Sequence, residues 1–303
     1  MNKKKILVTG GLGFIGGHVM EELAARGYYP VAFERIMKTD RTMLPNCEYE
    51  VFIGDIRDRN AVSTAVSMCE GAINLAGILG TSEAVDNPYP AAEANILGGL
   101  NFLQACREHK KRGVQIAVGN HFMNNTYSIT KTTTERFALM FNKEHGTKIA
   151  VVRGLNAYGE RQKHKPIRKI TPNFVTKALR GEAIKIFGSG ESVMDMIHVT
   201  DLAKILVEAL LNENTRFDKI YSAGPGVAST VNDIAETINN IAENKGGVEH
   251  IEMRQGETDN SVVLGEPDTL RDIFPGGYDF IPLGNGMDRT IRWFKEFYPW
   301  QED

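Results

Sequence analysis

Residues 5–17 have the sequence KILVTGGLGFIGG, in which three patterns follow one another. Ile6 to Val8 form an uninterrupted apolar run, which is typical of a buried parallel strand, and a glycine-rich turn begins after Thr9. From Phe14 to Leu23, apolar residues recur at helical spacing. The stretch therefore predicts a strand, a tight turn and a helix.

The glycines of this turn suit the binding of a pyrophosphate. Gly10 permits the sharp reversal, Gly13 lets the backbone approach phosphate oxygens, and Gly16 lets the helix pack close to the strand. Backbone N–H groups at the helix start, near Phe14 and Ile15, lie at the positive end of the helix dipole and favour an anion. An ordinary glycine turn is the alternative, but its place between a strand and a helix favours a dinucleotide fingerprint.

A second strand predicted at residues 31–33 ends at Glu34, about 20 residues beyond the glycines. A carboxylate there can accept both hydroxyls of the adenosine ribose, and it would repel a 2′-phosphate. We therefore expect NAD as the cofactor. Arg35 leaves NADP open, since its guanidinium could stack on adenine or bind a 2′-phosphate.

The chain has 303 residues, of which 42% are hydrophobic and 24% charged, and its net charge is −3. These values are ordinary for a globular enzyme of one large or two moderate domains, and they indicate neither a nucleic-acid nor a membrane partner. The three cysteines are far apart in sequence, so we expect no disulfide frame and no metal site. A reducing cytoplasm is the simplest location.

Strand and helix patterns alternate through residue 162, which predicts a doubly wound parallel sheet of the Rossmann type. We expect strands at 49–53, 71–77, 114–118 and 148–153, and helices at 61–68, 91–108 and 126–144. Ligands of such sheets bind at the carboxyl ends of the strands. Further candidate cofactor residues at these ends are Ile56, Leu75, Ala76, Gly77, the helical Asn95, and Asp55, which could alternatively cap the next helix.

Beyond residue 162 the alternation loosens. We assign 1–162 to an NAD-binding domain, to which 194–245 returns, and we assign 163–193 and 246–303 to a smaller α+β substrate lobe.

Tyr127 and Lys131 lie four residues apart near the start of a predicted helix, so both project from one face. The ammonium, the helix N-terminus and an oxidised nicotinamide could together lower the pKa of the phenol from about 10 toward physiological pH. Tyr127 could then take a hydroxyl proton while hydride leaves the same carbon.

Several motifs in order resemble the extended short-chain dehydrogenases/reductases of the nucleotide-sugar epimerase and dehydratase family, over nearly the whole chain. They are TGGLGFIG at 9–16, GDIRD at 54–58, NLAG at 74–77, NILGGLN at 95–101, YSITK at 127–131, RGLNAYGERQ at 153–162, MDMIHVTD at 194–201 and RQGE at 254–257. The resemblance implies a sugar-nucleotide substrate and a homodimer that pairs the helices at 91–108 and 127–144.

By the same resemblance, Asn156 and Arg254 hold the diphosphate, Phe187 lies against the base, and Asp195 belongs to the substrate site. A guanidinium suits a doubly charged diphosphate, and an aromatic face suits a flat base. Phe187 could instead be a core residue, and Arg254 could instead form a surface salt bridge.

The chain departs from the family at two places. The family usually ends its fifth strand with a Ser or Thr that binds the reacting hydroxyl, whereas this chain has Gly119 and Asn120, and Tyr127 follows after a short loop. Asn120, Thr126 or a water could replace the missing hydroxyl.

The second departure is Met194, where the family commonly has an arginine for the diphosphate. We expect compensation from nearby basic residues, which are Lys163, Lys165, Arg168 and Lys177.

These patterns favour an NAD-dependent epimerase that inverts a sugar carbon, commonly C4, through a transient keto-sugar. An NADPH-dependent keto-sugar reductase and a non-catalytic nucleotide-binding protein are the alternatives. Sugar 4,6-dehydration is disfavoured, because Gly119 and Asn120 cannot act as the acid and base that expel water.

Overall fold

The computed structural model describes residues 3–167 and 169–298. Its central sheet has seven parallel strands in the order β10-β6-β5-β4-β1-β2-β3. These are β1 (Lys5–Thr9), β2 (Tyr29–Glu34), β3 (Glu50–Ile53), β4 (Gly71–Asn74), β5 (Arg112–Val118), β6 (Ile149–Gly154) and β10 (Ile220–Ala223). The strand order reverses between β1 and β4, so the predicted doubly wound sheet is confirmed, with a ligand crevice expected at this switch point.

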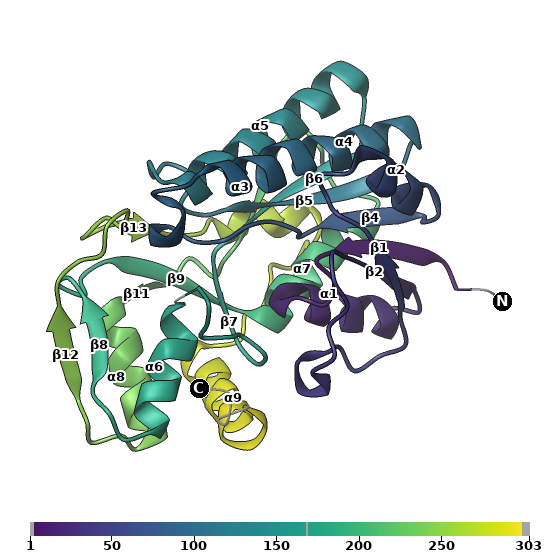
Figure 1. Cartoon of the computed structure of the whole chain (residues 1–303). Coiled ribbons are helices and arrows are strands. Elements are labelled where there is room, and N and C mark those ends of the chain that lie inside the picture. Colours follow the sequence, from purple (N-terminus) through teal and green to yellow (C-terminus); the bar gives the residue numbers. More distant parts are fainter. Residues whose placement is uncertain (1–2, 168, 299–303) are drawn as a thin grey trace.

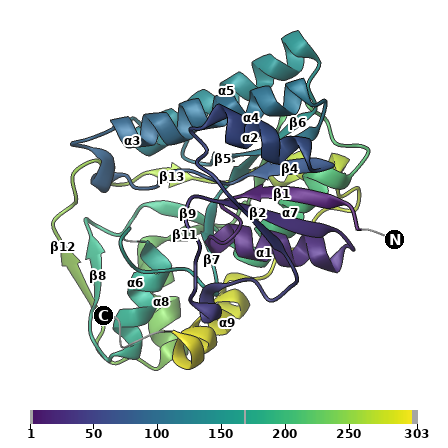
Figure 2. The ribbon, with the colours of Figure 1, turned by 45° about the vertical axis from the view of Figure 1, so that its right-hand side comes forward.

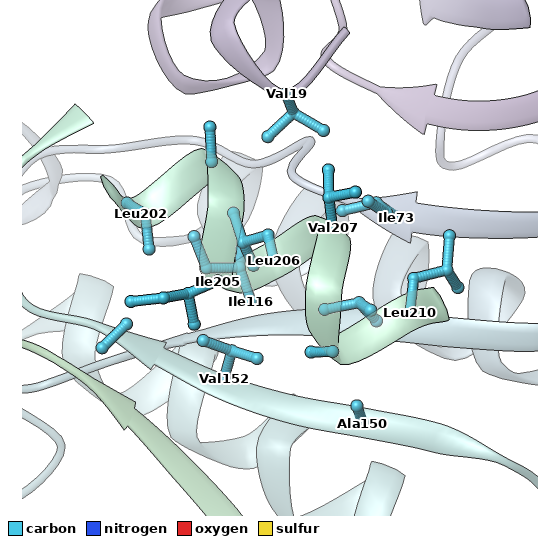
Figure 3. Packing of buried hydrophobic residues seen from close by; sticks show 14 of the residues in the cluster. Val19, Ile73, Ile116, Ala150, Val152, Leu202, Ile205, Leu206, Val207 and Leu210 are labelled. Carbon is cyan, nitrogen blue, oxygen red and sulfur yellow. The ribbon is translucent and has the colours of Figure 1, made fainter. Parts of the chain in front are cut away.

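Helices cover both faces of the sheet (Figure 1). One layer contains α1 (Phe14–Ala25) and α7 (Val199–Leu211), and the other contains α2 (Arg59–Ser67), α4 (Gly98–Glu108) and α5 (Thr126–His145). Successive residues of a strand point to opposite faces of the sheet and pack against different helix layers. Ile6 packs with the α1 and α7 side, and Leu7 with the opposite side. Figure 3 shows Leu206 and Val207 of α7 among residues of the sheet.

The helix predicted at 91–108 is interrupted. The structure has α3 (Tyr89–Ala91), then the π-helix η3 (Ala92–Leu97), and only then α4. π-Helical turns are uncommon and occur often at functional sites. Here the π-helix contains Asn95, whose side chain is buried.

The lobe lies below the sheet in Figures 1 and 2. In it, β8 (Ile184–Phe187) pairs with β12 (Val248–Ile251), while β9 (Val193–His198) pairs with β7 (Asn156–Tyr158), β11 (Ala228–Thr230) and β13 (Val262–Val263). Its helices are α6 (Ile170–Leu179), α8 (Val231–Ala242) and α9 (Leu283–Phe297), which share one apolar cluster. The remaining short helices are the 3-10 turns η1 (Arg41–Met43), η2 (Ser82–Ala84) and η4 (Pro267–Asp272).

The chain passes between the main sheet and the lobe at more points than the expected domain boundaries allow. From 194–245, α7 and β10 join the main sheet, but α8 packs into the lobe through Ile234 and Ile238. From 246–303, Leu270 of η4 packs into the core of the main sheet. Of the helices in the described residues, none is both long and apolar enough to cross a lipid bilayer.

Candidate active site

A cavity of about 430 Å³ lies over the carboxyl ends of β1 and β2, and we call it the glycine-turn cavity. Its lining includes Gly10, Gly13, Phe14, Ile15, Gly16, Glu34, Arg35, Asp55, Ile56, Leu75, Ala76, Gly77, Tyr127 and Lys131. Every residue expected to contact the dinucleotide is therefore brought to this cavity, except Asn95.

The backbone of the glycine turn has the shape that a pyrophosphate needs. Gly10 has a φ of +70°, and a Cβ on Gly16 would lie 2.1 Å from the Gly10 carbonyl oxygen. Gly13 is the N-cap of α1, where no side chain caps the helix and the first turn has no acidic residue. The first N–H groups of α1 thus meet neither a capping side chain nor a repelling carboxylate, which fits an anion.

Glu34 ties the end of β2 to this turn. Its Oε1 accepts a hydrogen bond from the Leu12 N–H at 2.6 Å, while Lys38 Nζ donates to the Leu12 carbonyl at 2.8 Å. Burial raises the pKa of Glu34, and the charge of Lys38 acts in the opposite direction. Because a carboxylate has several acceptor positions, it keeps capacity for the hydroxyls of a ribose.

Asp55 is not the cap of the following helix. Asp58 caps α2, accepting from the N–H groups of Asn60 and Ala61. Asp55 instead pairs with Arg57 at 2.8 Å and faces the glycine-turn cavity.

Asn95 shapes the cavity from behind. Its Oδ1 accepts from the Ile78 N–H at 2.8 Å, and its Nδ2 donates to the Ile78 carbonyl at 3.0 Å and to Thr130 Oγ1 at 2.9 Å. Its buried amide is therefore engaged by protein groups, and it holds the loop after β4 whose residues line the cavity.

Tyr127 and Lys131 stand one turn apart on α5, whose N-cap is Asn125. Burial raises the pKa of Tyr127 to about 12 and lowers that of Lys131 to about 8. In the protein without cofactor, burial alone sets the direction of the shift, because removing the phenolate from water disfavours the charged form. The expected lowering, which includes the charge of a bound nicotinamide, stays a prediction.

Gly119 stands near the place of the family's Ser or Thr, and Thr126 and Asn120 are the candidate replacements. These three residues have different surroundings. A Cβ on Gly119 would lie 2.3 Å from Leu155 Cδ1, so this position cannot accept a side chain without rearrangement. The Thr126 hydroxyl donates to the Ala84 carbonyl at 3.0 Å. Asn120 lines a second cavity.

That second cavity, the lobe cavity, has a volume of about 1020 Å³ and lies between the sheet and the lobe. Its lining includes the expected substrate residues Asn156, Phe187 and Arg254, together with Met194. Of the basic segment expected to compensate for Met194, Lys165 and Lys177 line the cavity, Lys163 is exposed outside it, and Arg168 lies outside the described residues.

Arg254 and Phe187 contact each other. The guanidinium lies 4.6 Å from the centre of the Phe187 ring and pairs with Glu257, which accepts a hydrogen bond from Thr81 Oγ1 at 3.1 Å. Phe187 is thus a wall of the cavity and not a fully buried core residue.

Asp195 is not a lining residue of either cavity. It is completely buried, and its Oδ2 accepts from the N–H groups of Gly226 and Gly265, each at 2.8 Å. Through Oδ2 its carboxylate joins three segments of backbone, and a role in substrate binding stays a prediction.

The sequence interpretation missed Lys169. This residue is the N-cap of α6, lines the lobe cavity, and places Nζ 5.8 Å from the centre of the Tyr127 ring. The signal available was a lysine one position beyond the basic segment that we considered. Within residues 3–167 and 169–298, no group of His, Cys, Asp and Glu side chains could hold a metal ion.

Comparisons with known proteins agree with this geometry. The family model described as "NAD dependent epimerase/dehydratase family" matches residues 6–224. A UDP-glucose 4-epimerase of Rhizobium leguminosarum is 27% identical, over 90% of this chain and 92% of its own. A UDP-N-acetyl-alpha-D-glucosaminuronate decarboxylase of Bacillus cytotoxicus is 23% identical, over 97% and 98%. Among solved structures, Thermotoga maritima UDP-glucose 4-epimerase with UDP-glucose has a TM-score of 0.86 at 25% identity, covering 96% of this chain and 99% of that one.

Proposed function

Because the chain belongs to the NAD dependent epimerase/dehydratase family, we propose that it epimerises a nucleotide-activated sugar, at C4, with NAD as its cofactor. One observation carries the proposal. Tyr127 lines the glycine-turn cavity, and its ring is contacted by Lys169, which lines the lobe cavity. The phenol therefore lies between the place that fits a dinucleotide and the place that fits a nucleotide sugar.

NAD, when bound, supplies a hydride acceptor that can also return the hydride to the opposite face of the sugar. Tyr127 accepts the hydroxyl proton as the C–H bond breaks and gives it back to the keto-sugar oxygen. Lys131 holds positive charge one turn from the phenol and favours its ionised form against the effect of burial.

The glycine-turn cavity provides fixed sites for the cofactor. The N–H groups at the start of α1 would hold the pyrophosphate, and Glu34 would bind the adenosine ribose. Asp55 and Ile56 line the cavity where they would contact the adenine, and Ala76 and Gly77 are small residues of the lining on the side of the nicotinamide half.

In the lobe cavity, Asn156 and Arg254 hold the diphosphate and Phe187 lies against the base. Among the described residues that line this cavity, Glu257 is the only carboxylate, and it is paired with Arg254. A dehydratase needs a free acid and base beside the reacting carbon, so this lining favours epimerisation over dehydration.

The test is isotope exchange with a panel of sugar nucleotides in deuterated water. An epimerase with internal hydride return converts one epimer into the other without deuterium at the inverted carbon. Tyr127→Phe should lower kcat at least about 100-fold, since it removes the group that moves the proton. Tyr89→Phe is the matched control, because Tyr89 is 76% exposed. Deuterium at the inverted carbon, or an unimpaired Tyr127→Phe variant, would overturn the mechanism.

The reductase remains a second candidate because Arg35 is exposed at the rim of the glycine-turn cavity, where it could bind a 2′-phosphate. Steady oxidation of added NADPH by a keto-sugar nucleotide would identify it. Nucleotide binding without turnover by the wild-type protein, even across a broad panel, would instead support the non-catalytic alternative.

We also propose that the chain forms a homodimer through the outer layer of helices. Leu97 of η3, and Ile129 and Met140 of α5, are exposed apolar residues of this layer. Burying them against a second copy removes apolar surface from water. Sedimentation at micromolar concentration should give the mass of a dimer, and a monomer would contradict this proposal.

A further inference from the structure

We propose that Lys169 is a catalytic residue, whose ammonium group donates a hydrogen bond to the sugar oxygen that Tyr127 deprotonates. This inference rests on the proposed function, because it assigns a further group to the same reaction. The lobe would thereby contribute to the chemistry as well as to substrate binding.

The proposed reaction needs a group that stabilises negative charge on the sugar oxygen. Charge develops on the sugar oxygen as its proton leaves, and a preorganised donor aimed at that oxygen is a large contributor to catalysis. Near Tyr127, the Thr126 hydroxyl already donates to the Ala84 carbonyl, Ser128 is completely buried, and Gly119 has no side chain. Hydroxyl groups of this segment are therefore poorly placed to serve.

Lys169 has the required position. It approaches Tyr127 from the lobe, with Nζ 5.8 Å from the ring centre, whereas Lys131 lies on the same helix as the phenol. Its backbone is fixed, because its carbonyl accepts from the Asn173 N–H at 3.2 Å and from Asn173 Nδ2 at 2.7 Å. A flexible four-carbon stem on this anchor lets three N–H donors reach an oxygen beside the phenol.

The pKa of Lys169 is lowered, with burial as the main cause, and the neighbouring charges act on it in both directions. Burial lowers the pKa of Lys169, while Glu83 and Glu257 raise it and Arg254 lowers it further. A sugar oxygen held beside Tyr127 would meet a partly buried ammonium, and a partly desolvated charge interacts more strongly than a fully exposed one.

The step balances with the NAD of the proposed function as the hydride acceptor. The hydroxyl proton moves to the ionised Tyr127 Oη as the C–H electron pair leaves as hydride to NAD, and both return when the keto-sugar is reduced. Lys169 keeps its three protons throughout, and its hydrogen bond is strongest when the oxygen carries most charge.

The test compares Lys169→Met and Lys169→Gln with Lys169→Arg, and uses Lys204→Met as the control, because Lys204 is exposed on α7. Both neutral variants should lower kcat about 100-fold or more while KM changes by less than about threefold. Lys169→Arg should recover most of kcat, since it restores a charged donor. A rise in KM with kcat unchanged would show a substrate-binding role and overturn the proposal.

A second readout separates this inference from the proposed function. With isotope-labelled tyrosine and saturating NAD, nuclear magnetic resonance should show a higher pKa of Tyr127 in Lys169→Met than in the wild type, and the wild-type value in Lys204→Met. An unchanged pKa of Tyr127 would overturn the inference even if no substrate is found. Conversely, failure of the wild-type protein to convert any sugar nucleotide would overturn the proposed function and leave this titration valid.

Discussion

One wall of the glycine-turn cavity is glycine backbone, whereas the lobe cavity has Arg, Lys and Phe side chains in its lining. In the first, Gly10, Gly13 and Gly16 bring N–H groups to a fixed place, and Glu34 is bonded to the turn itself. In the second, Arg254 lies on Phe187 and is paired with a residue of its own loop.

This difference indicates which of the two cavities can adapt to a different ligand. A site made of backbone cannot change its ligand without refolding, so it suits a cofactor common to a whole family. A site made of Arg, Lys and Phe side chains can exchange partners by rotamer changes, so it suits a substrate that differs between relatives. Substitutions should therefore act abruptly in the first cavity and gradually in the second.

The largest effect should come from Gly16→Ala. Its Cβ would lie 2.1 Å from the Gly10 carbonyl oxygen and 2.8 Å from Gly11 Cα, so the turn must shift. We expect a loss of about 3 kcal/mol in the free energy of unfolding and a fall in NAD affinity of more than about 100-fold. Urea unfolding and calorimetric titration with NAD measure these two quantities.

The neighbouring glycine provides the control. A Cβ on Gly17 meets Arg161 Nη1 at 3.6 Å, which is ordinary contact, and Gly17 lies within α1. Gly17→Ala should therefore leave NAD affinity unchanged and stabilise the helix by up to about 1 kcal/mol. Equal effects of the two substitutions would contradict the claim that backbone shape defines this cavity.

A smaller effect is expected at the seam between the two regions. Glu160 lies 3.2 Å from His198 Nε2 and accepts from Arg289 of α9 at 3.0 to 3.2 Å. Burial acts to raise the pKa of Glu160, but the contacts with His198 and Arg289 outweigh it and lower the pKa to about 2. Since the folded pKa is depressed, this stabilisation is present above the ordinary pKa near 4.5 and is lost as pH falls toward 2.

Glu160→Gln tests this pH dependence. The variant should lose about 2 kcal/mol in the free energy of unfolding at pH 7, after allowance for screening, and its stability should fall less steeply than that of the wild type below about pH 4.5. Urea unfolding across this pH range measures both. Asp218→Asn, at an exposed surface pair, should change neither, and parallel curves for wild type and Glu160→Gln would refute the assignment.

The contrast between the cavities also explains what the sequence could predict. The glycine turn, Glu34 and the Tyr127–Lys131 pair depend on short spacings within a single strand–turn–helix unit or helix, and their periodicity is visible in the chain. The doubly wound parallel sheet followed from the alternation of strands and helices, whereas its strand order was seen only in the structure.

Other features depend on segments that are distant in sequence. Nothing near Asp195 in the sequence indicates that the backbone at Gly226 and Gly265 will surround it, and only the family resemblance assigned it to the substrate site. The pKa of Tyr127 depends on how deeply α5 is buried, and the contact with Lys169 depends on how the lobe docks. Burial and docking are properties of the assembled fold, and local pattern does not encode them.

The smallest effect should come from the lobe cavity, where Arg254→Ala tests whether its side chain holds a diphosphate. The diphosphate must draw the guanidinium away from Glu257, so part of the attraction replaces an existing pair. We therefore expect affinity for UDP to fall only about tenfold, which is about 1.4 kcal/mol, while affinity for NAD stays unchanged. Arg271→Ala is the matched control, since Arg271 forms an exposed pair with Asp268 at the same spacing. If Arg254→Ala lowered the affinity for NAD as much as the affinity for UDP, the two cavities would not bind separate ligands. The proposal that glycine backbone binds the cofactor while side chains of the lobe cavity bind the substrate would then be wrong.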